Sequence, residues 1–350
     1  MPGLFVTALF AVYFLRQSSR TSAIDEWAIE GPTMGTVYTI KVVHDGDRPA
    51  EARERLEEGI REAVDAVDDT MSTYRPNSEV EVFNRHGSEP FAASLDLITV
   101  IAEAQRVSRL SGGAFDITVG PLVDRWGFGP SGPTDRPTEN EIAELVASTG
   151  YQHLQVDVDR RLLRKARPDC RIDLSAIAKG FAVDRVAQVL DREGYRNYMV
   201  EIGGEVRARG RNRSREFWKI GIEQPDAGGR SIHVAIPLAD VSLATSGDYR
   251  NFVIRDGVRI SHTIDPRTGR PISHHLASVS VINASCMTAD ALATALDVLG
   301  PDEGLALAES HDIPALFLVR VGEGVFEERR TAVWTALVEN IRAPIPVDSG

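Results

Sequence analysis

The sequence predicts an α+β fold made of two interleaved lobes of mixed or antiparallel sheet with helices. Segments with strand and helix periodicity are mixed along the chain, without the strict βα alternation that a doubly wound parallel sheet requires. A run of short strand candidates within 197–244 is flanked on both sides by helix candidates. The length of 350 residues allows one large domain, or two interlocked ones, with a substantial core.

The amino-terminal part contains one predicted strand and two predicted helices. Thr36–Val43 alternates as TVYTIKVV, which is typical of a strand entered from Met34-Gly35. Ala50–Met71 repeats apolar residues at steps of three and four, so we expect a helix with one apolar face. A second helix is predicted over Leu95–Ser111, where Gly112-Gly113 would end it.

Four segments in the middle of the chain are easy to assign. Residues 72–87 are expected to form a polar loop, and residues 114–130 a glycine-rich and aromatic binding loop rather than a helix or strand. Thr138 and Glu141 have the spacing of a capping box and predict a helix that ends near residue 150. The segments 153–158 and 161–165 then predict a hairpin.

The next region combines a strand, a helix and a series of short strands. Arg171–Asp173 is predicted as a short strand that leads into a helix over Ala176–Arg192, with Gly194 as its C-cap. The strands that follow are predicted at Asn197–Ile202, Glu205–Arg209, Phe217–Ile222, Ile232–Ile236 and Val241–Ala244.

A hairpin, a strand and two helices are predicted after residue 250. Asp256-Gly257 is typical of a tight turn between Asn251–Arg255 and Val258–Ile264, which puts His262 near the end of a strand. The later elements are predicted as a strand at Ala277–Ile282, helices at Thr288–Leu299 and Asp302–Ser310, and a strand at Ala315–Val319.

The amino terminus has a different composition from the rest. Leu4–Leu15 is an uninterrupted apolar run of the length of a signal-peptide core, so residues 1–25 are predicted to be a signal peptide or membrane anchor, with the folded domain at 26–345. Arg16 and Arg20 follow the run, whereas a standard signal carries its basic residues before it, so cleavage and anchoring both stay open. We therefore expect a periplasmic protein, exported or anchored to the inner membrane.

The charge and the cysteines exclude two classes of protein. A formal net charge of −12 argues against sequence-independent nucleic-acid binding, which needs a basic surface for phosphates. It is compatible with one small phosphorylated ligand held by a local cation. Cys170 and Cys286 form neither a CxxC pair nor a disulfide framework, and we expect both to be small buried residues.

Two segments could hold a cation and a phosphate. Asp290 and Thr294 are four residues apart on a predicted helix, so their oxygens project from one face, as suits Mg²⁺. The alternative is a surface Asp favoured by the helix dipole. Asp173 ends a predicted strand just before a helix whose free N–H groups and Lys179 could bind phosphate. The alternative here is an ordinary N-capped helix.

Two other segments could hold the rest of a ligand. In Ser111–Gly120 the paired glycines allow close approach to the backbone, and Phe115 and Asp116 offer an aromatic surface and an acceptor. A helix end followed by a turn is the alternative. His262 could be a general base, because its pKa lies near neutrality in the absence of other influences, or it could be a structural hydrogen-bonding residue. The sequence lacks GxGxxG, P-loop, GxSxG and HExxH motifs.

Taken together and in order, these segments resemble the ApbE family of FAD:protein FMN transferases over roughly residues 30–320. The segments that carry the resemblance are MGT at 34–36, MSTYRPNSEVEVFN at 71–84, GGAFDITVGPLVDRWGFGP at 112–130, DLSAIAKGFAVDR at 173–185, EIGGEVRARG at 201–210, ATSGDYRNF at 244–252, SHTIDPRTGRP at 261–271 and CMTADALATALDVLG at 286–300.

The resemblance implies a reaction and a set of site residues. Members of the family bind FAD with Mg²⁺ and move its FMN half onto a threonine or serine hydroxyl of a target protein, releasing AMP. His262 would be the catalytic base. The residues expected at the FAD site, between the two lobes, are Met34, Tyr74, Ala114, Phe115, Asp116, Asp173, Lys179 and Ile264. The expected metal ligands are Asp290, Thr294 and the backbone carbonyl of Ala176. Position 293 is alanine where some members have a further carboxylate, which implies a weaker or more hydrated metal shell.

Two alternatives share this site. Water could replace the protein hydroxyl, which would make the chain a Mg²⁺-dependent FAD pyrophosphatase that yields FMN and AMP. A flavin-binding protein without turnover is the alternative from a different class. If the chain is a transferase, the resemblance implies an acceptor flavoprotein, such as a subunit of a membrane redox complex.

Overall fold

A large antiparallel sheet forms the centre of the computed structural model, which describes residues 24–46, 48–132, 135–225, 231–247, 252–255 and 258–342. Its eight strands run in the order β1-β2-β6-β7-β10-β15-β16-β17, and each neighbouring pair is antiparallel. The strands are β1 (Ile24–Thr33), β2 (Thr36–Asp45), β6 (Asn197–Ile202), β7 (Glu205–Arg209), β10 (Val241–Gly247), β15 (Leu276–Asn283), β16 (Ala315–Gly322) and β17 (Val325–Arg330).

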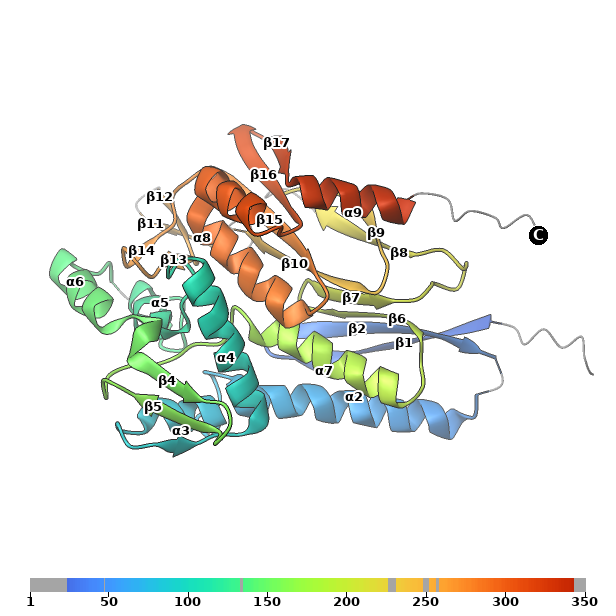
Figure 1. Cartoon of the computed structure of the whole chain (residues 1–350), viewed down its shortest axis with the longest axis horizontal. Coiled ribbons are helices and arrows are strands. Elements are labelled where there is room, and N and C mark those ends of the chain that lie inside the picture. The colour runs from blue at the N-terminus through green and yellow to red at the C-terminus, as the bar shows by residue number, and fades with distance from the viewer. Residues whose placement is uncertain are drawn as a thin grey trace, which may run out of the picture.

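Helices cover one face of this sheet (Figure 1). They are α2 (Ala50–Met71), α7 (Ala178–Arg192) and α8 (Cys286–Ser310). Alternate residues of β2 and β6 face them, and their apolar side chains enter the main core with those of α2 and α7. In β2 these inward residues are Tyr38, Ile40 and Val42, all buried.

The opposite face of the sheet is covered over only part of its area. The hairpin of β8 (Trp218–Glu223) and β9 (Ile232–Leu238), together with α9 (Ala332–Arg342), packs there as a third layer. Trp218, Ile236 and Trp334 are buried in this smaller core. The remaining area of the same face is left open toward a cavity.

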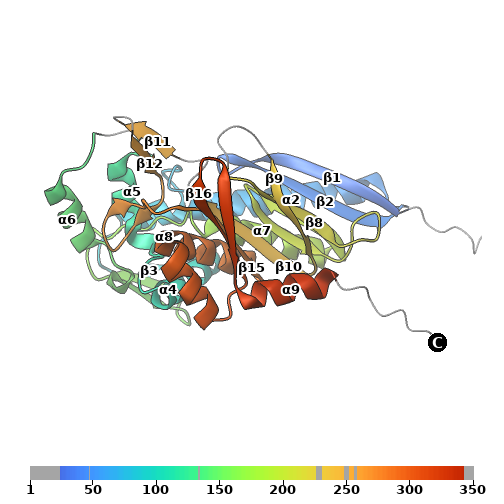
Figure 2. The same ribbon diagram turned by 90° about the horizontal axis from the view of Figure 1, so that it is seen from above.

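A second lobe lies at one end of the molecule, as both views show (Figures 1 and 2). It contains two separate stretches of the chain, one before α7 and one after β10, so the two lobes are interleaved. Its elements are α3 (Glu79–Arg85), β3 (Phe91–Ala92), α4 (Leu95–Leu110), α5 (Gly120–Trp126), α6 (Glu139–Ser148), β4 (Leu154–Asp157), β5 (Leu162–Lys165), β11 (Phe252–Arg255), β12 (Val258–Ser261), β13 (Ile264–Asp265) and β14 (Arg270–Pro271).

The predicted fold class is confirmed, as are most of the predicted elements. The capping box of Thr138 and Glu141 begins α6. The two helices predicted around residue 300 are confirmed as the two parts of α8, which are separated by a kink at Gly300, where φ is 78° and ψ is −174° and Pro301 follows. Asp256-Gly257, the predicted turn, lies outside the described residues.

Three predictions about local structure are wrong. Arg171–Asp173 is not a strand, because the backbone of Ile172 bonds to the side chain of Asn84 and not to a neighbouring strand. The loop predicted at 72–87 contains α3, which Ser78 caps by accepting from the N–H of Glu81. The segment 114–130 contains α5 and a short 3₁₀ turn, Ile117–Val119, although it does line the cavity as a binding loop would.

Most of the predicted signal or anchor segment lies outside the described residues. Ile24 and Asp25, the last two residues of the segment 1–25, already belong to β1. Among the helices that the structure describes, none is long and apolar enough to cross a membrane.

Candidate active site

The predicted site residues surround one cavity of about 1250 Å³. Its floor is the open face of the large sheet, formed by alternate residues of three strands: Val37, Thr39 and Lys41 of β2, Met199 and Glu201 of β6, and Leu243 and Thr245 of β10. Drug-sized ligands usually occupy roughly 300–1,000 Å³, so this cavity has room for a dinucleotide and part of a second reactant. All twelve predicted site residues line it, namely Met34, Tyr74, Ala114, Phe115, Asp116, Asp173, Ala176, Lys179, His262, Ile264, Asp290 and Thr294.

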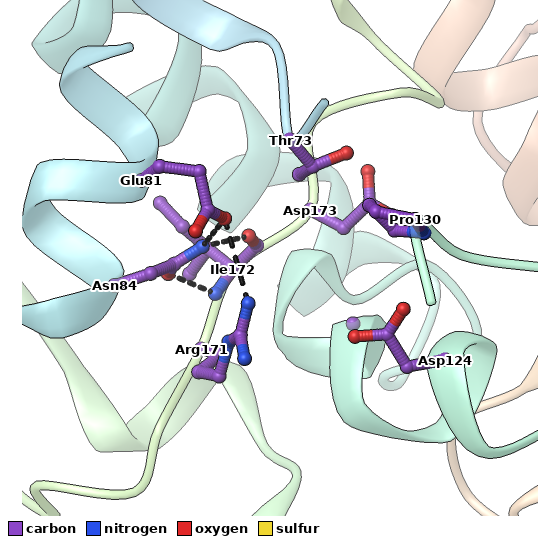
Figure 3. A pocket seen from close by; sticks show the side chains of 9 residues that line it. Thr73, Glu81, Asn84, Asp124, Pro130, Arg171, Ile172 and Asp173 are labelled. Carbon is purple, nitrogen blue, oxygen red and sulfur yellow. Dashed lines mark hydrogen bonds and ion pairs between the residues drawn. The ribbon is translucent and has the colours of Figure 1, made fainter. Parts of the chain in front are cut away.

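The segment before α7 is held by side chains of the second lobe (Figure 3). Asn84, buried on α3, accepts from the N–H of Ile172 at 2.8 Å and donates to its carbonyl at 2.9 Å. Glu81 in turn accepts from Asn84 at 2.9 Å and pairs with Arg171 at 3.5 Å. These contacts fix the backbone just before Asp173, so they determine where its carboxylate enters the cavity.

Asp173 itself is oriented by its immediate neighbours. Its N–H donates to the carbonyl of Ile117 at 2.7 Å, and its Oδ1 accepts from the N–H of Ser175 at 2.8 Å. Tyr74 lies nearby and is 69% exposed. Partial burial and the negative charges of Asp173 and Asp124 raise the pKa of the Tyr74 phenol, so it stays protonated and can donate a hydrogen bond.

Lys179 connects α7 to two acidic groups on other elements. Its Nζ lies 2.7 Å from Oε1 of Glu205 on β7 and 3.9 Å from Oδ1 of Asp290 on α8. Burial alone lowers the pKa of Lys179, but the charges of Asp290 and Glu205 outweigh this effect and raise it. Burial raises the pKa of both carboxyl groups, and the positive charge of Lys179 opposes that rise.

The amino-terminal end of α8 positions Asp290. Ser285 caps the helix, and the carboxylate of Asp184 accepts from the N–H groups of Cys286 and Met287, both at 3.1 Å. One turn further on, Asp290 is 5% exposed and its Oδ2 accepts from the N–H of Gly180 at 2.9 Å. Two helices therefore fix the orientation of this carboxylate.

The predicted magnesium ligands fit the ion in chemical type. Oδ1 of Asp290 is too far from Lys179 Nζ for a hydrogen bond and is available for a cation. Thr294 lies one turn along the same side of α8, and Ala176 reaches the cavity from the turn just before α7. One carboxylate with a hydroxyl and a carbonyl suits Mg²⁺, which completes its shell with waters and phosphate oxygens.

Two further observations bear on the metal site. Within the part of the chain that the structure describes, no group of three or more His, Cys, Asp or Glu side chains could hold a metal ion. The predicted set has one carboxylate, with a hydroxyl and a backbone carbonyl, so it is not a cluster of three such side chains. Ala293 is 1% exposed in the hydrophobic core and is not among the described residues that line the cavity.

His262 lies between β12 and β13, at the cavity wall formed by the second lobe. Its ring meets the ring of Phe128 edge-on, with 6.4 Å between centroids and an interplanar angle of 72°. The next residue, Thr263, donates from its hydroxyl to Oδ2 of Asp297 at 3.4 Å, and Ser246 donates to the same oxygen at 3.1 Å. The histidine loop is thereby attached to α8, the helix that carries Asp290.

The other predicted cofactor residues differ in how they reach the cavity. Met34 has a φ of 45°, which is uncommon for a residue other than glycine, in the two-residue turn with Gly35 between β1 and β2. Ile264 is buried against Leu122, Trp126 and Ile142. Both oxygens of Asp116 already accept from protein donors, so the contacts described for this residue hold its own loop in shape.

The sequence analysis missed one residue that lines the cavity, Glu205, and two that support its walls, Asp184 and Asp297. Glu205, buried at 3% exposure, is the main partner of Lys179. Asp297, fully buried, is seven residues beyond Asp290 and therefore on the same side of α8. Asp184 holds the start of that helix. The i, i+4, i+7 spacing of Asp290, Thr294 and Asp297 was the available signal; Glu205 had none beyond its position after Gly203-Gly204.

The fold and the site together define a class: an antiparallel α+β protein with a dinucleotide-sized cavity, bordered by a histidine, a lysine and a buried carboxylate. The family model of the ApbE family matches residues 34–317. The chain belongs to the ApbE family.

Individual relatives agree with this assignment. The FAD:protein FMN transferase of Vibrio cholerae is 48% identical over 302 residues, which cover 85% of this chain and 89% of the relative. That of Haemophilus influenzae is 41% identical over 318 residues, which cover 89% of this chain and 91% of the relative.

Solved structures agree as well. The flavin transferase ApbE from Vibrio cholerae matches with a TM-score of 0.82 at 45% identity, over 89% of this chain and 99% of that one. The apo form of the Pseudomonas stutzeri flavinyl transferase ApbE matches with a TM-score of 0.82 at 40% identity, over 92% of this chain and 98% of that one.

Proposed function

We propose that this chain transfers the FMN moiety of FAD to a threonine or serine hydroxyl of an acceptor protein and releases AMP. The observation that carries the proposal is the single cavity that His262, Lys179 and Asp290 share, since three separate elements bring a base, a cation and a carboxylate to one place. Relatives at 48% and 41% identity are named FAD:protein FMN transferase, which supports the same reaction.

The reaction forms one P–O bond and breaks another, and one proton is transferred. The acceptor hydroxyl oxygen attacks the phosphorus of the FMN half, and the bond from that phosphorus to the bridging oxygen breaks, so AMP leaves with that oxygen. His262 takes the proton of the attacking hydroxyl. Asp173 borders the cofactor at the entrance to α7, and Lys179 offsets the charge that grows on the phosphate oxygens.

Magnesium would be held by Asp290, Thr294 and the carbonyl of Ala176. When bound, the ion supplies electrophilic stabilisation of the pyrophosphate oxygens. Replacing Asp290 by Ala should abolish the response of the transfer rate to added Mg²⁺. A variant that keeps full activity and still responds to Mg²⁺ would remove Asp290 from the metal site.

The proposed reaction is tested by incubating the chain with FAD, Mg²⁺ and a candidate acceptor. Denaturing electrophoresis is then scored for flavin fluorescence within the gel. Fluorescence that stays on the acceptor band supports transfer. Free FMN and AMP with a dark acceptor band would support the pyrophosphatase, and intact FAD would support a binding protein without turnover.

The location and the acceptor belong to the same proposal. The apolar run at residues 4–15 supports export or anchoring to the inner membrane, with the folded part in the periplasm. An acceptor there, such as a flavoprotein subunit of a membrane redox complex, could meet the cavity. Cell fractionation tests the location, and recovery of the chain in the cytoplasm alone would contradict it.

A further inference from the structure

Strand β8 borders the cavity with five consecutive residues of its six. Lys219, Ile220, Gly221, Ile222 and Glu223 all line it. A strand that presents one face to a cavity lines it with every second residue, because successive side chains point to opposite sides. Consecutive lining residues therefore mean that the backbone edge of β8 faces the cavity.

Among the described residues, β8 has a neighbouring strand on one side only. The described part of β8 pairs with β9 and with no other described strand. Lys219 is opposite Pro237, which has no N–H, so this pair cannot exchange backbone hydrogen bonds. Directly opposite pairs alternate in an antiparallel ladder, so the next non-bonded pair is Gly221 with Ala235.

A hydrogen bond at the end of the hairpin supports the same alternation of bonded and non-bonded pairs. The N–H of Gln224, the residue after β8, donates to the carbonyl of Ser231 at 2.8 Å. The register shift between Ile222 and Glu223 places its extra residue on β9, so the alternation along β8 is kept and the even-numbered residues are the ones that bond to β9. The N–H and C=O groups of Lys219 and Gly221 consequently point away from β9, toward the cavity. Gly221 has no side chain to obstruct an approaching backbone.

We propose that this edge of β8, residues 219–223, is the docking site for the acceptor protein and that it binds an extended segment of the acceptor as an added β-strand. The proposal rests on the proposed function, because transfer requires a protein hydroxyl inside the cavity that holds His262. The edge and the histidine line the same cavity, so a segment paired with β8 enters the space where the hydroxyl must react. At about 3.3 Å per residue, five residues provide an edge roughly 16 Å long.

Strand addition explains how one site could accept a reactive residue from a folded partner. Backbone hydrogen bonds supply affinity that is independent of the acceptor's side chains, and alternate side chains supply selectivity. On β8 the bonds would come from the N–H and C=O groups of Lys219 and Gly221. An exposed edge strand is a ready template for such pairing.

Two substitutions of Gly221 test whether its backbone N–H pairs with the acceptor, since both add a Cβ and only one removes the N–H. Gly221→Pro removes the outward N–H but no bond to β9, whereas Gly221→Ala keeps that N–H. In both variants the new Cβ would lie about 3.1 Å from the side chain of Ile232, which is 67% exposed and free to shift outward. Their difference therefore reports the replacement of the outward N–H by the proline ring carbon, which removes the donor and blocks strand pairing at that point.

The probe is a library of short synthetic peptides that each contain one threonine, with transfer scored as covalent flavin on the peptide. For the best peptide, we expect Gly221→Pro to raise KM roughly 2- to 10-fold over Gly221→Ala, as for loss of one backbone hydrogen bond. FAD affinity, measured by flavin fluorescence, should be equal in the two variants. N-methylation of successive amides of the peptide should raise KM at every second position.

The experiment distinguishes a failure of the proposed function from a failure of the docking site. If the unchanged chain labels neither peptides nor any protein with flavin, the proposed function is wrong and the docking site falls with it. If it labels a folded acceptor but no peptide, or if KM is the same in both variants, transfer stands and docking at the β8 edge is wrong. An N-methyl effect without alternation would also overturn strand addition.

Discussion

The backbone N–H of Gly180 donates to Oδ2 of Asp290 at 2.9 Å and joins the first turn of α7 to the first turns of α8. The two residues are 110 positions apart in the sequence. This bond leaves Oδ1 of Asp290 directed to the side of Lys179. The proposed cation site thus depends on how closely two helices approach, and glycine at position 180 permits that approach.

The first prediction follows from this packing. A Cβ at position 180 would lie 2.4 Å from the carbonyl oxygen of Cys286 and 2.8 Å from Cβ of Asp290. Gly180→Ala should therefore force α7 and α8 apart, lower the free energy of unfolding by about 1–3 kcal/mol and weaken Mg²⁺ binding. Urea unfolding and magnesium titration measure both effects. The matched control is Gly87→Ala, where a Cβ meets no atom within 4 Å; equal effects in the two variants would refute this explanation.

The second prediction concerns His262, the proposed general base. His262→Ala should retain FAD affinity and reduce the transfer rate about 10²- to 10⁴-fold, the usual contribution of a general base. His275→Ala, at an exposed histidine outside the cavity lining, is the control and should transfer normally. Single-turnover kinetics with bound FAD provide the rate. Unchanged transfer by His262→Ala would exclude this histidine as the base.

The third prediction tests whether the hydrogen bonds between Asn84 and Ile172 position Asp173. Asn84→Ala leaves the buried backbone N–H of Ile172 without its acceptor, which should cost about 1–3 kcal/mol of unfolding free energy. Asn84→Asp keeps that acceptor but loses the donor and sets a carboxylate against Glu81. Both variants should bind FAD more weakly, since Asp173 follows directly. Isothermal titration with FAD checks this, and undiminished affinity in both would show that Asn84 does not position the site.

The fourth prediction is a dependence of stability on pH. The backbone N–H and hydroxyl of Thr138, followed by Arg125, lower the pKa of Glu141 to about 2. A lowered pKa means that the ionised form favours the folded state. The stabilisation is fully present above about pH 4.5 and is lost as the pH falls through about 2.

Glu141→Gln isolates this contribution. The variant should be less stable than the unchanged chain at pH 7, and the difference should shrink between pH 4.5 and pH 2. Denaturant unfolding at a series of pH values measures it, with the exposed Glu144→Gln on the same helix as control. Ile142 and Val146 of the same helix lie beside Gly269, in the loop that follows Ile264. A difference that is constant down to pH 2 would contradict the assignment.

Most of the fold could be predicted from the sequence because periodicity is a local property. The boundaries of α2 match its apolar stripe, and those of β6 and β7 match their alternation. Arg171–Asp173 could not be predicted, because Ile172 satisfies its backbone with an amide side chain 88 residues away. The sequence pattern of an apolar residue between two charged ones is the same in a strand and in a segment whose backbone bonds to a side chain.

Some residues of the site could also be predicted from the sequence, and others could not. Residues with chemical motifs around them, such as Asp173, Asp290 and His262, could be proposed from the sequence and all line the cavity. Glu205 could not, since its role depends on Lys179 reaching it from another element at 2.7 Å. The edge of β8 was also hidden, because its significance comes from the register with Pro237 and from the residues that surround the cavity.

The central claim is that a protein hydroxyl, and not water, receives the FMN group in this cavity. The most direct measurement is the ratio of AMP released to flavin covalently bound to the acceptor, in a reaction with FAD and Mg²⁺ followed to completion. Transfer predicts one AMP for each flavin on the acceptor, with no free FMN. AMP and free FMN in equal amounts, with no flavin on the acceptor, would contradict the claim.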